Sequence, residues 1–214
     1  MARNVNAKDG IRQFVVGHLE TNCYAVVSDG ECLVVDPGAQ GTQIAEALDD
    51  VKVIGIVATH GHHDHVGGVR ALKEATGAPF SISRGDAERC QHALELSSHV
   101  FDVSGGSVED APEPDCLLAE GDVLKVGSRV FRVIESPGHT EGGIVLLGED
   151  VAFVGDTIFA GSVGRTDLVG GDAEVLMQTL DRLKREIPPQ TVLLCGHGVA
   201  TTMERELATN PWFA

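Results

Sequence analysis

The sequence predicts an α/β fold in which two β-sheets pack face to face and helices cover their outer sides. Both halves of the chain show the same order of elements, with short strands rich in β-branched residues followed by helical segments. Hydrophobic residues make up 43% of the 214 residues, enough to build a sizeable core, and no low-complexity stretch interrupts them. We therefore expect one globular domain covering residues 1–214.

The first half is predicted to alternate between strands and helices. Apolar runs bounded by turn residues predict strands at residues 11–19, 23–28, 31–38, 51–59 and 78–83. Apolar spacing of three and four residues predicts helices at residues 42–50, 66–77 and 85–96, the second ending at Gly77. Residues 97–120 show no regular pattern, and we expect them to form a long surface loop.

The second half repeats this style. Apolar runs with glycine turns predict strands at residues 121–136, 142–150, 151–157 and 191–198. A helix is predicted over residues 172–186, with Asp172 as its N-cap and Pro188 and Pro189 ending it. Thr201 and Glu204 have the spacing of a capping box that opens a last helix.

Charge and cysteine content narrow the class of protein. Sixteen basic residues stand against 32 acidic ones, a net charge of −16 without a Lys/Arg cluster, so binding to nucleic acid is not expected. The chain shows neither the apolar core of a secretory signal nor a run of about 18 apolar residues, so we expect a cytoplasmic protein without a membrane span. Five scattered cysteines without a CxxC pair favour reduced thiols over disulfides.

The segment THGHHDH, residues 59–65, carries the densest group of metal-ligating side chains. In a loop, His60 and His62 can turn toward one point while the adjacent Asp64 and His65 face a second point nearby. Imidazole and carboxylate groups are the ligands that zinc and iron favour in sites open to water or substrate. The spacing therefore predicts two neighbouring metal positions, with His63 as a spacer that faces solvent or supports a ligand.

Three further strand ends carry ligand side chains. His139 in SPGHT and His197 in GHG each follow a glycine, which lets backbone approach a crowded site, and Asp156 lies in GDT. Metal-ligating residues at four separate strand ends indicate a built metal centre rather than a solvated histidine-rich loop. The histidines without such a setting are expected to have ordinary surface or hydrogen-bonded roles, and these are His18, His92 and His99.

The ordered segments THxHxDH, SPGHT, GDT and GHG resemble the metallo-β-lactamase-fold hydrolase superfamily over roughly residues 14–209. GDTIFAGSVGRTDLVGGD and GHGVATTMERELATNP are similar to the short glyoxalase II-like proteins, the hydroxyacylglutathione hydrolases. The resemblance implies a four-layer αββα sandwich. It also implies two metal positions bridged by Asp156, one held by His60, His62 and His139 and the other by Asp64, His65 and His197.

The activity implied by this resemblance is hydrolysis of a small-molecule thioester, S-lactoylglutathione or a related acyl thioester, by a hydroxide bridging two divalent metals. Asp64 and Asp156 are the expected catalytic residues. Two cations that share a carboxylate lower the pKa of a bound water toward neutrality, so no serine or cysteine nucleophile is needed. Zinc is the metal expected first, although nitrogen and oxygen ligands also accept iron or manganese. The oligomeric state is left open.

Residues around the ligands have two readings each. Asp36 and Thr140 either support ligand loops or serve only as a strand end and a turn cap. Arg165 either holds a substrate carboxylate or forms an internal pair with Asp167, and the internal pair is favoured. Cys195 is expected to act as a small buried hydrophobe.

Other activities on the same fold are the alternatives. Persulfide dioxygenases share much of the ligand pattern and a GRTD loop but use a single iron, and a cysteine usually precedes their loop, whereas this chain reads FAGSVGRTD. An esterase or lactonase would use the same hydroxide, and a nuclease is disfavoured by the acidic charge. Larger glyoxalase II enzymes carry a C-terminal helical region for glutathione, whereas this chain ends about 17 residues after His197, so broad thioester turnover is expected.

Overall fold

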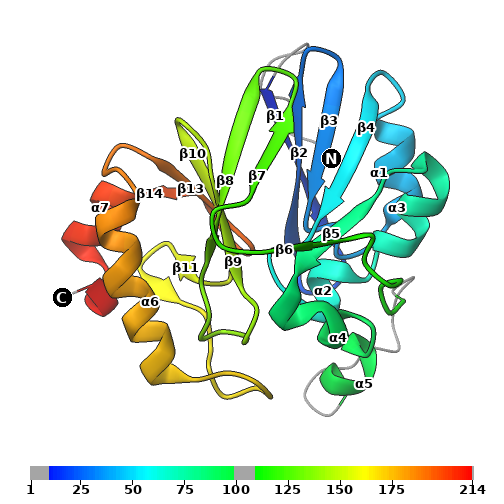
Figure 1. Cartoon of the computed structure of the whole chain (residues 1–214). Helices are drawn as coiled ribbons and strands as arrows, with labels where there is room; N and C mark the ends of the chain where they lie inside the picture. Colours follow the sequence, from blue (N-terminus) through cyan, green and yellow to red (C-terminus); the bar gives the residue numbers. More distant parts are fainter. Residues whose placement is uncertain (1–9, 99–108, 214) are drawn as a thin grey trace.

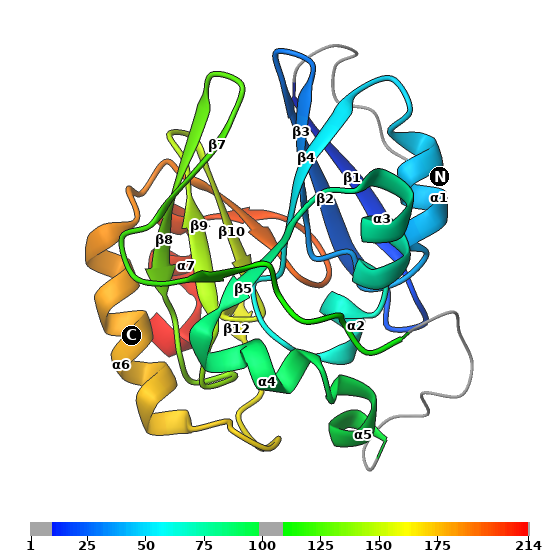
Figure 2. The same cartoon turned by 45° about the vertical axis from the view of Figure 1, so that its right-hand side comes forward.

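The computed structural model describes residues 10–98 and 109–213, and within them two six-stranded sheets pack face to face. Helices cover the outer side of each sheet, as Figures 1 and 2 show from two directions. This is the four-layer αββα arrangement that the sequence predicts.

The first sheet has the strand order β1-β2-β3-β4-β5-β6. Its first three strands run antiparallel, and β3 to β6 run parallel to one another. The strands are β1 (Gly10–Val16), β2 (Thr21–Ser28), β3 (Glu31–Val35), β4 (Lys52–Val57), β5 (Phe80–Ser83) and β6 (Cys116–Leu118). Helices α1 (Gly41–Ala47) and α3 (Val69–Thr76) pack on its outer face through a cluster that includes Ile44 and Leu72.

The second sheet has the strand order β14-β13-β10-β9-β8-β7, and its neighbours are antiparallel except for β10 and β13. The strands are β7 (Val123–Val126), β8 (Arg129–Glu135), β9 (Ile144–Leu147), β10 (Val151–Gly155), β13 (Val192–Cys195) and β14 (Thr201–Thr202). Its outer face is covered by α6 (Ala173–Glu186), α7 (Met203–Thr209) and the 3-10 turn η2 (Pro211–Phe213).

The inner faces of the two sheets form the central core. Val26, Val35 and Val57 from the first sheet meet Phe131 and Phe153 from the second. Every residue of β2 is buried, since this strand lies between the inner core and the outer helices. Double burial of this kind explains why the strand reads as an almost continuous apolar run rather than as an alternating one.

Four short strands were not predicted. A two-stranded hairpin of β11 (Ile158–Phe159) and β12 (Ser162–Val163) follows Asp156, and β14 and β6 have two and three residues. Strands this short cannot show a periodic pattern. The prediction of a loop over residues 97–120 was therefore wrong at its end, where β6 pairs with β5, and residues 99–108 of that loop lie outside the described residues.

The helix predicted over residues 85–96 is interrupted. It divides into the 3-10 turn η1 (Arg84–Asp86), α4 (Ala87–Cys90) and α5 (Ala93–Ser97). A continuous helix would need the N–H of Leu94 to donate to the carbonyl of Cys90. Both groups instead bond to residues 110 and 111. The backbone N–H of Ala111 donates to the carbonyl of Cys90 at 3.0 Å, and the carboxylate of Asp110 accepts from the N–H of Leu94 at 2.8 Å.

The other helix boundaries differ less from the predictions. Gly77 ends α3 with a left-handed φ of 71°, as predicted, but that helix starts at Val69 because a separate short helix, α2 (His63–Val66), precedes it. The last helix is capped by Thr202, whose hydroxyl accepts from the N–H of Arg205, so the predicted capping box was one residue out of register. Thr201 lies in β14 and donates instead to Glu206.

Two further findings concern the cysteines and the length of the helices. All five cysteines lie in the described part of the chain and none forms a disulfide. Among the helices within residues 10–98 and 109–213, none is both long and apolar enough to span a bilayer.

The N-cap of α6 offers a test of the outer layer. The Asp172 carboxylate accepts from the N–H groups of Glu174 and Val175, and the Asp172 N–H binds the carbonyl of Gly138. We expect Asp172→Ala to lower the free energy of unfolding by about 1 kcal/mol and Asp172→Asn to change it little, because asparagine also caps helices well. Urea unfolding of the three proteins measures this, and equal losses in both variants would contradict the capping role.

Candidate metal centre

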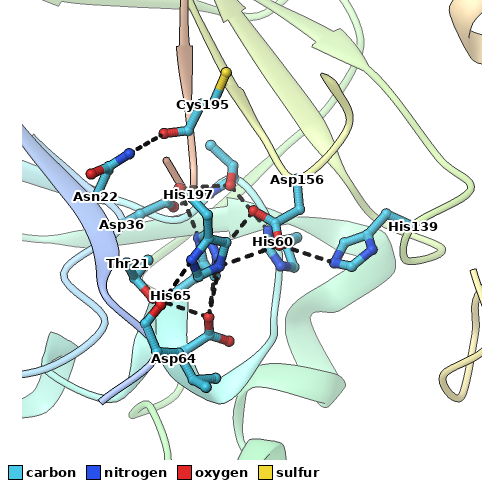
Figure 3. Close-up of polar contacts among 12 residues, drawn as sticks. Thr21, Asn22, Asp36, His60, Asp64, His65, His139, Asp156, Cys195 and His197 are labelled. Carbon is cyan, nitrogen blue, oxygen red and sulfur yellow. Dashed lines mark hydrogen bonds and ion pairs between the residues drawn. The ribbon is translucent and has the colours of Figure 1, made fainter. Parts of the chain in front are cut away.

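The seven predicted ligands converge on one cluster, and Figure 3 labels six of them, all except His62. Their ligand atoms form three groups, within each of which every pair lies within 4.8 Å. The groups are His60, His62 and His139; His60, His65 and Asp156; and Asp64, His65 and His197. The two ends of the cluster match the two predicted positions, and Asp156 lies between them.

Strand ends from both sheets supply these side chains. The histidine segment leaves β4, and His139 follows β8, while Asp156 and His197 follow the parallel pair β10 and β13. The parallel pair brings Asp156 and His197 to the same edge. Gly196 leaves the necessary space, because a Cβ atom there would lie 2.6 Å from Cε1 of His65 and would overlap a carboxylate oxygen of Asp156.

Four of the five candidate imidazoles are oriented through Nδ1. His139 Nδ1 lies 2.7 Å from the Arg165 carbonyl, and His197 Nδ1 lies 3.1 Å from the Leu19 carbonyl. His60 Nδ1 lies 3.1 Å from the Thr59 hydroxyl, and His65 Nδ1 lies 3.0 Å from a carboxylate oxygen of Asp36. Fixing Nδ1 in this way leaves Nε2 directed to the shared space, which is the usual support for metal-binding histidines.

The atoms left facing that space fit a cation. Nε2 of His60, His65 and His139 and Oδ1 of Asp156 are buried and make no hydrogen bond within the described residues, although His65 Nε2 and Asp156 Oδ1 lie 3.3 Å apart as an ion pair. Buried polar atoms without a partner are rare and costly in folded proteins. Two divalent ions bound by nitrogen and oxygen donors, one at each end of the cluster, would satisfy these atoms.

The electrostatics of the two ends differ. Burial, reinforced by His139, lowers the pKa of His62 to about 3, and burial with neighbouring imidazoles lowers the pKa of His60 well below its usual value. Burial also opposes protonation of His65, but three carboxylates, led by Asp156, raise its pKa well above the usual value. A cation at that end would replace the proton, whereas the lowered pKa values of His60 and His62 keep these two imidazoles neutral, as a metal-bound histidine must be.

Asp36 supports the site, as one of its two readings predicts. Its carboxylate accepts from the backbone N–H of Thr59 at 2.6 Å and from the Thr59 hydroxyl at 2.8 Å, beside its contact with His65. Thr140 is buried nearby, but its hydroxyl makes no hydrogen bond in the described part of the chain, so the structure gives its side chain no such role.

The expectations for His63 and Arg165 each resolve to one alternative. His63 does not face solvent, because it is only 1% exposed and its ring stacks on that of His18 at a centroid distance of 6.0 Å. Its Nδ1 lies 3.8 Å from a carboxylate oxygen of the candidate ligand Asp64, as its other reading predicts. Arg165 forms the favoured internal pair, with Nε 2.6 Å from an oxygen of Asp167. Cys195 is a buried thiol, and burial raises its pKa to about 12, which makes it a poor nucleophile.

Three supporting residues were missed by the sequence reasoning. Thr21 donates to the Asp64 carboxylate at 3.0 Å, and the Asn22 amide donates to the carbonyls of Cys195 and Gly198, both at 3.0 Å. Asp86, discussed below, is the third. The available signal for the first two was a polar pair at the start of a strand that is otherwise apolar.

A cavity of about 460 Å³ opens over the cluster. Candidate ligands form its floor, and its walls are mainly apolar, with Arg165 as the cationic residue among those lining it. The apolar wall residues are Leu19, Phe159, Val163 and Leu168. The site therefore combines a polar, buried floor with a water-excluding wall that can receive a small organic molecule.

Comparison with known families agrees with this geometry. The model of the metallo-beta-lactamase superfamily matches residues 16–197, which is most of the chain. The chain belongs to the metallo-beta-lactamase superfamily.

Relatives in this superfamily match the chain over nearly its whole length. An uncharacterized protein of Aquifex aeolicus is 41% identical and covers 94% of this chain and 96% of its own length. Hydroxyacylglutathione hydrolase GloC of Haemophilus influenzae is 30% identical and covers 90% of this chain and 92% of its own length. Both relatives are similar to this chain in size as well as in sequence.

Solved structures also match this chain over most of its length. The BLEG-1 B3 metallo-beta-lactamase has a TM-score of 0.86 at 30% identity, over 95% of this chain and 99% of that one. TTHA1623, solved in a di-iron-bound form, has a TM-score of 0.82 at 32% identity, over 94% and 98%. ETHE1 from Myxococcus xanthus has a TM-score of 0.72 at 26% identity, over 94% and 83%.

The contacts of Asp36 lead to a prediction. We expect Asp36→Asn to weaken metal affinity about 10- to 100-fold, because an amide nitrogen, which cannot accept, would replace one of the two carboxylate oxygens that accept from Thr59, and the negative charge beside His65 would be lost. Asparagine tolerates the left-handed backbone of this position, where φ is 53°, so the fold should be kept. Competition with a chromogenic chelator measures the affinity.

Asp29→Asn is the matched control for this change. Asp29 has nearly the same backbone conformation, with φ 52°, and its carboxylate also accepts a backbone N–H, that of Ser128, but it lies in the turn between β2 and β3. Its metal affinity should equal that of the wild type. Equal affinity in Asp36→Asn and Asp29→Asn would rule out the supporting role.

Proposed function

We propose that this chain is a metal-dependent hydrolase of acyl thioesters, with S-lactoylglutathione or a related acyl thioester as its substrate. The observation that carries the proposal is the convergence of seven histidine and aspartate side chains, five of which line the floor of a cavity with mainly apolar walls. Membership in the superfamily supports a hydrolase, and the relative named hydroxyacylglutathione hydrolase supports the thioester.

The chain would hold two divalent ions. His60, His62 and His139 would bind one ion, Asp64, His65 and His197 the other, and Asp156 would contact both. Bound there, the ions would supply Lewis-acid activation of a carbonyl and a water ionised near neutral pH. Zinc is favoured, while the di-iron form of TTHA1623 keeps iron as an alternative and the donor set also accepts manganese.

The surrounding residues would position the substrate. The apolar walls formed by Leu19, Phe159 and Val163 would hold the acyl and thiol portions and exclude bulk water. Asp64 is held by Thr21. Despite burial, the neighbouring imidazoles of His65 and His197 lower the pKa of its carboxyl well below the usual value, so it stays ionised at the floor of the cavity. Cys195 would be a poor nucleophile, because it is buried with a raised pKa, and no cysteine is among the described residues that line the cavity.

Glutathione thioesters remain within the proposed substrate class. The relative GloC is named for that activity and aligns over 92% of its own length with this chain, so a protein of this size can carry the name. This weakens the expectation that a long additional helical region is needed. We propose turnover of glutathione thioesters together with other small acyl thioesters.

The metal content tests the site directly. Protein purified in zinc-containing buffer should hold two metal ions per chain, and Asp156→Ala should lose metal and reduce thioester hydrolysis by several orders of magnitude, because one carboxylate serves both positions. His92→Ala, which changes an exposed histidine away from the cluster, should match the wild type in both respects. Elemental analysis and a thiol-release assay measure these quantities. A wild-type value near one ion per chain, unchanged by zinc supplementation, would contradict the two-metal site.

Oxygen dependence separates hydrolysis from the alternative of an iron-dependent persulfide dioxygenase. Hydrolysis needs neither oxygen nor a redox-active metal, so zinc-loaded protein should release thiol from S-lactoylglutathione equally well in air and under strict anaerobiosis. Thiol release is measured with a chromogenic reagent under both atmospheres.

The same preparation should not consume oxygen with glutathione persulfide. Oxygen uptake by the iron-loaded protein, combined with no detectable thioester cleavage by the zinc form, would replace the proposed activity with the dioxygenase. An ester and a lactone tested alongside the thioester would show whether hydrolysis extends to oxygen esters.

A further inference from the structure

A buried carboxylate outside the ligand set joins two of the ligand-bearing loops. Asp86, in the turn that leads from β5 into α4 (Figure 2), has no exposed surface. One of its oxygens accepts the backbone N–H of Gly61 at 2.7 Å, and the other accepts the backbone N–H of Gly142 at 2.9 Å. These two glycines belong to loops that leave different sheets, so this side chain joins the two halves of the molecule beside the cluster.

The neighbours of Asp86 make this joint rigid. A Cβ atom at Gly142 would overlap the backbone nitrogen of Asp86, and the hydroxyl of Ser83 donates to the Gly142 carbonyl. A Cβ atom at Gly61 would lie 3.0–3.1 Å from the side-chain carbons of Arg89. Arg89 also places Nε 3.5 Å from an oxygen of Asp86 and has a side chain only 8% exposed, so the buried charge is paired.

Both glycines are closely tied to ligands. Gly61 lies between His60 and His62, so its peptide orientation constrains both imidazoles. Gly142 lies three residues after His139 in a loop closed by the Ser136 N–H, which donates to the Gly143 carbonyl at 2.6 Å. Asp86 therefore sets the spacing within the three-histidine group, in which the His139 ring centroid lies 4.8 Å from that of His60 and 4.6 Å from that of His62.

The other end of the cluster has different supports. Asp64 is held by the Thr21 hydroxyl, and His197 is oriented by the Leu19 carbonyl, both from the start of β2 and the turn before it. Within the described residues, Asp86 makes no hydrogen bond or ion pair with either of these ligands. Asp86 is thus physically separate from Thr21 and Leu19. Asp36, by contrast, serves both ends through Thr59 and His65.

We propose that Asp86 is a positioning residue that acts selectively on the metal position formed by His60, His62 and His139. The inference rests on the two-metal site proposed above. Asp86→Asn exchanges one acceptor oxygen for an amide nitrogen that would face a backbone N–H, so one of the two loops loses its anchor. The affinity of the three-histidine position should fall about 10- to 100-fold while the other position keeps its ion.

Zinc occupancy under limiting metal is the test. Wild type, Asp86→Asn, Thr21→Val and Asp110→Asn are dialysed against zinc buffered at a level that just fills the wild type, and each is analysed for zinc per chain. Anomalous diffraction at the zinc edge then gives the occupancy of each position. Asp110→Asn is the matched control, because its carboxylate accepts the Leu94 N–H but contacts no ligand loop.

The inference predicts three different patterns. Asp86→Asn should retain about one zinc per chain, located with Asp64, His65 and His197, whereas Thr21→Val should deplete that position and keep the three-histidine one. Asp110→Asn should retain both ions at wild-type occupancy. Thermal unfolding of zinc-free samples shows whether a variant is folded, and Arg89→Gln, which leaves both acceptor oxygens in place, serves as a milder second variant with a smaller loss at the same position.

Other results would contradict the proposed role of Asp86. Equal depletion of both positions in Asp86→Asn, or full occupancy in both Asp86→Asn and Arg89→Gln, would leave Asp86 with a structural role only. A wild type that binds a single zinc would contradict the two-metal proposal instead. The role of Asp86 would then survive only if that zinc lies among the three histidines and is weakened by Asp86→Asn.

Discussion

The carboxylate of Asp36 is the contact on which the rest of the site depends. Asp36 follows β3 in a left-handed conformation, with φ 53°. Its carboxylate accepts from both the backbone N–H and the hydroxyl of Thr59, which follows β4. The same Thr59 hydroxyl lies against Nδ1 of His60, and the same carboxylate lies against Nδ1 of His65. One buried acid therefore fixes where the histidine segment leaves the sheet and how two of its imidazoles turn.

The second constraint is the register between the two sheets at this edge. The Asn22 backbone N–H donates to the Gly196 carbonyl at 2.7 Å, and the Tyr24 hydroxyl donates to the Cys195 carbonyl at 2.7 Å, so the start of β2 is bound to the end of β13. His197 follows directly. Because the ligands come from both sheets, the distance between sheets must be fixed at the edge itself, and polar contacts with defined lengths do this better than the apolar core behind them.

Much of the architecture and the whole candidate ligand set could be predicted from the sequence. The ligands His60, His62, Asp64 and His65 have diagnostic local spacing, and the isolated ones stand at glycine-marked strand ends. Long strands and α6 were predicted because their apolar periodicity and caps are also local.

What could not be predicted depends on contacts between distant segments. The break between α4 and α5 arises because Asp110 and Ala111 take the hydrogen-bonding groups of Leu94 and Cys90. For His63, a spacer position, the sequence left open whether it faces solvent or supports a ligand, and the choice follows from burial where α2 begins. Asp86 has no motif of its own, and its importance appears only when the loops from both sheets are seen to meet on it.

The arrangement also couples ion binding to the stability of the fold. Asp64 and Asp156 bring two carboxylates into a buried cluster, and the unsatisfied Nε2 atoms of His60 and His139 add to the cost of keeping it together. Ions bound to these groups would remove that cost in the folded chain, whereas an unfolded chain cannot assemble ligands separated by more than a hundred residues. Binding energy at the site is therefore also folding energy, and the supports at Asp36 and Asp86 place the ligands where that energy can be gained.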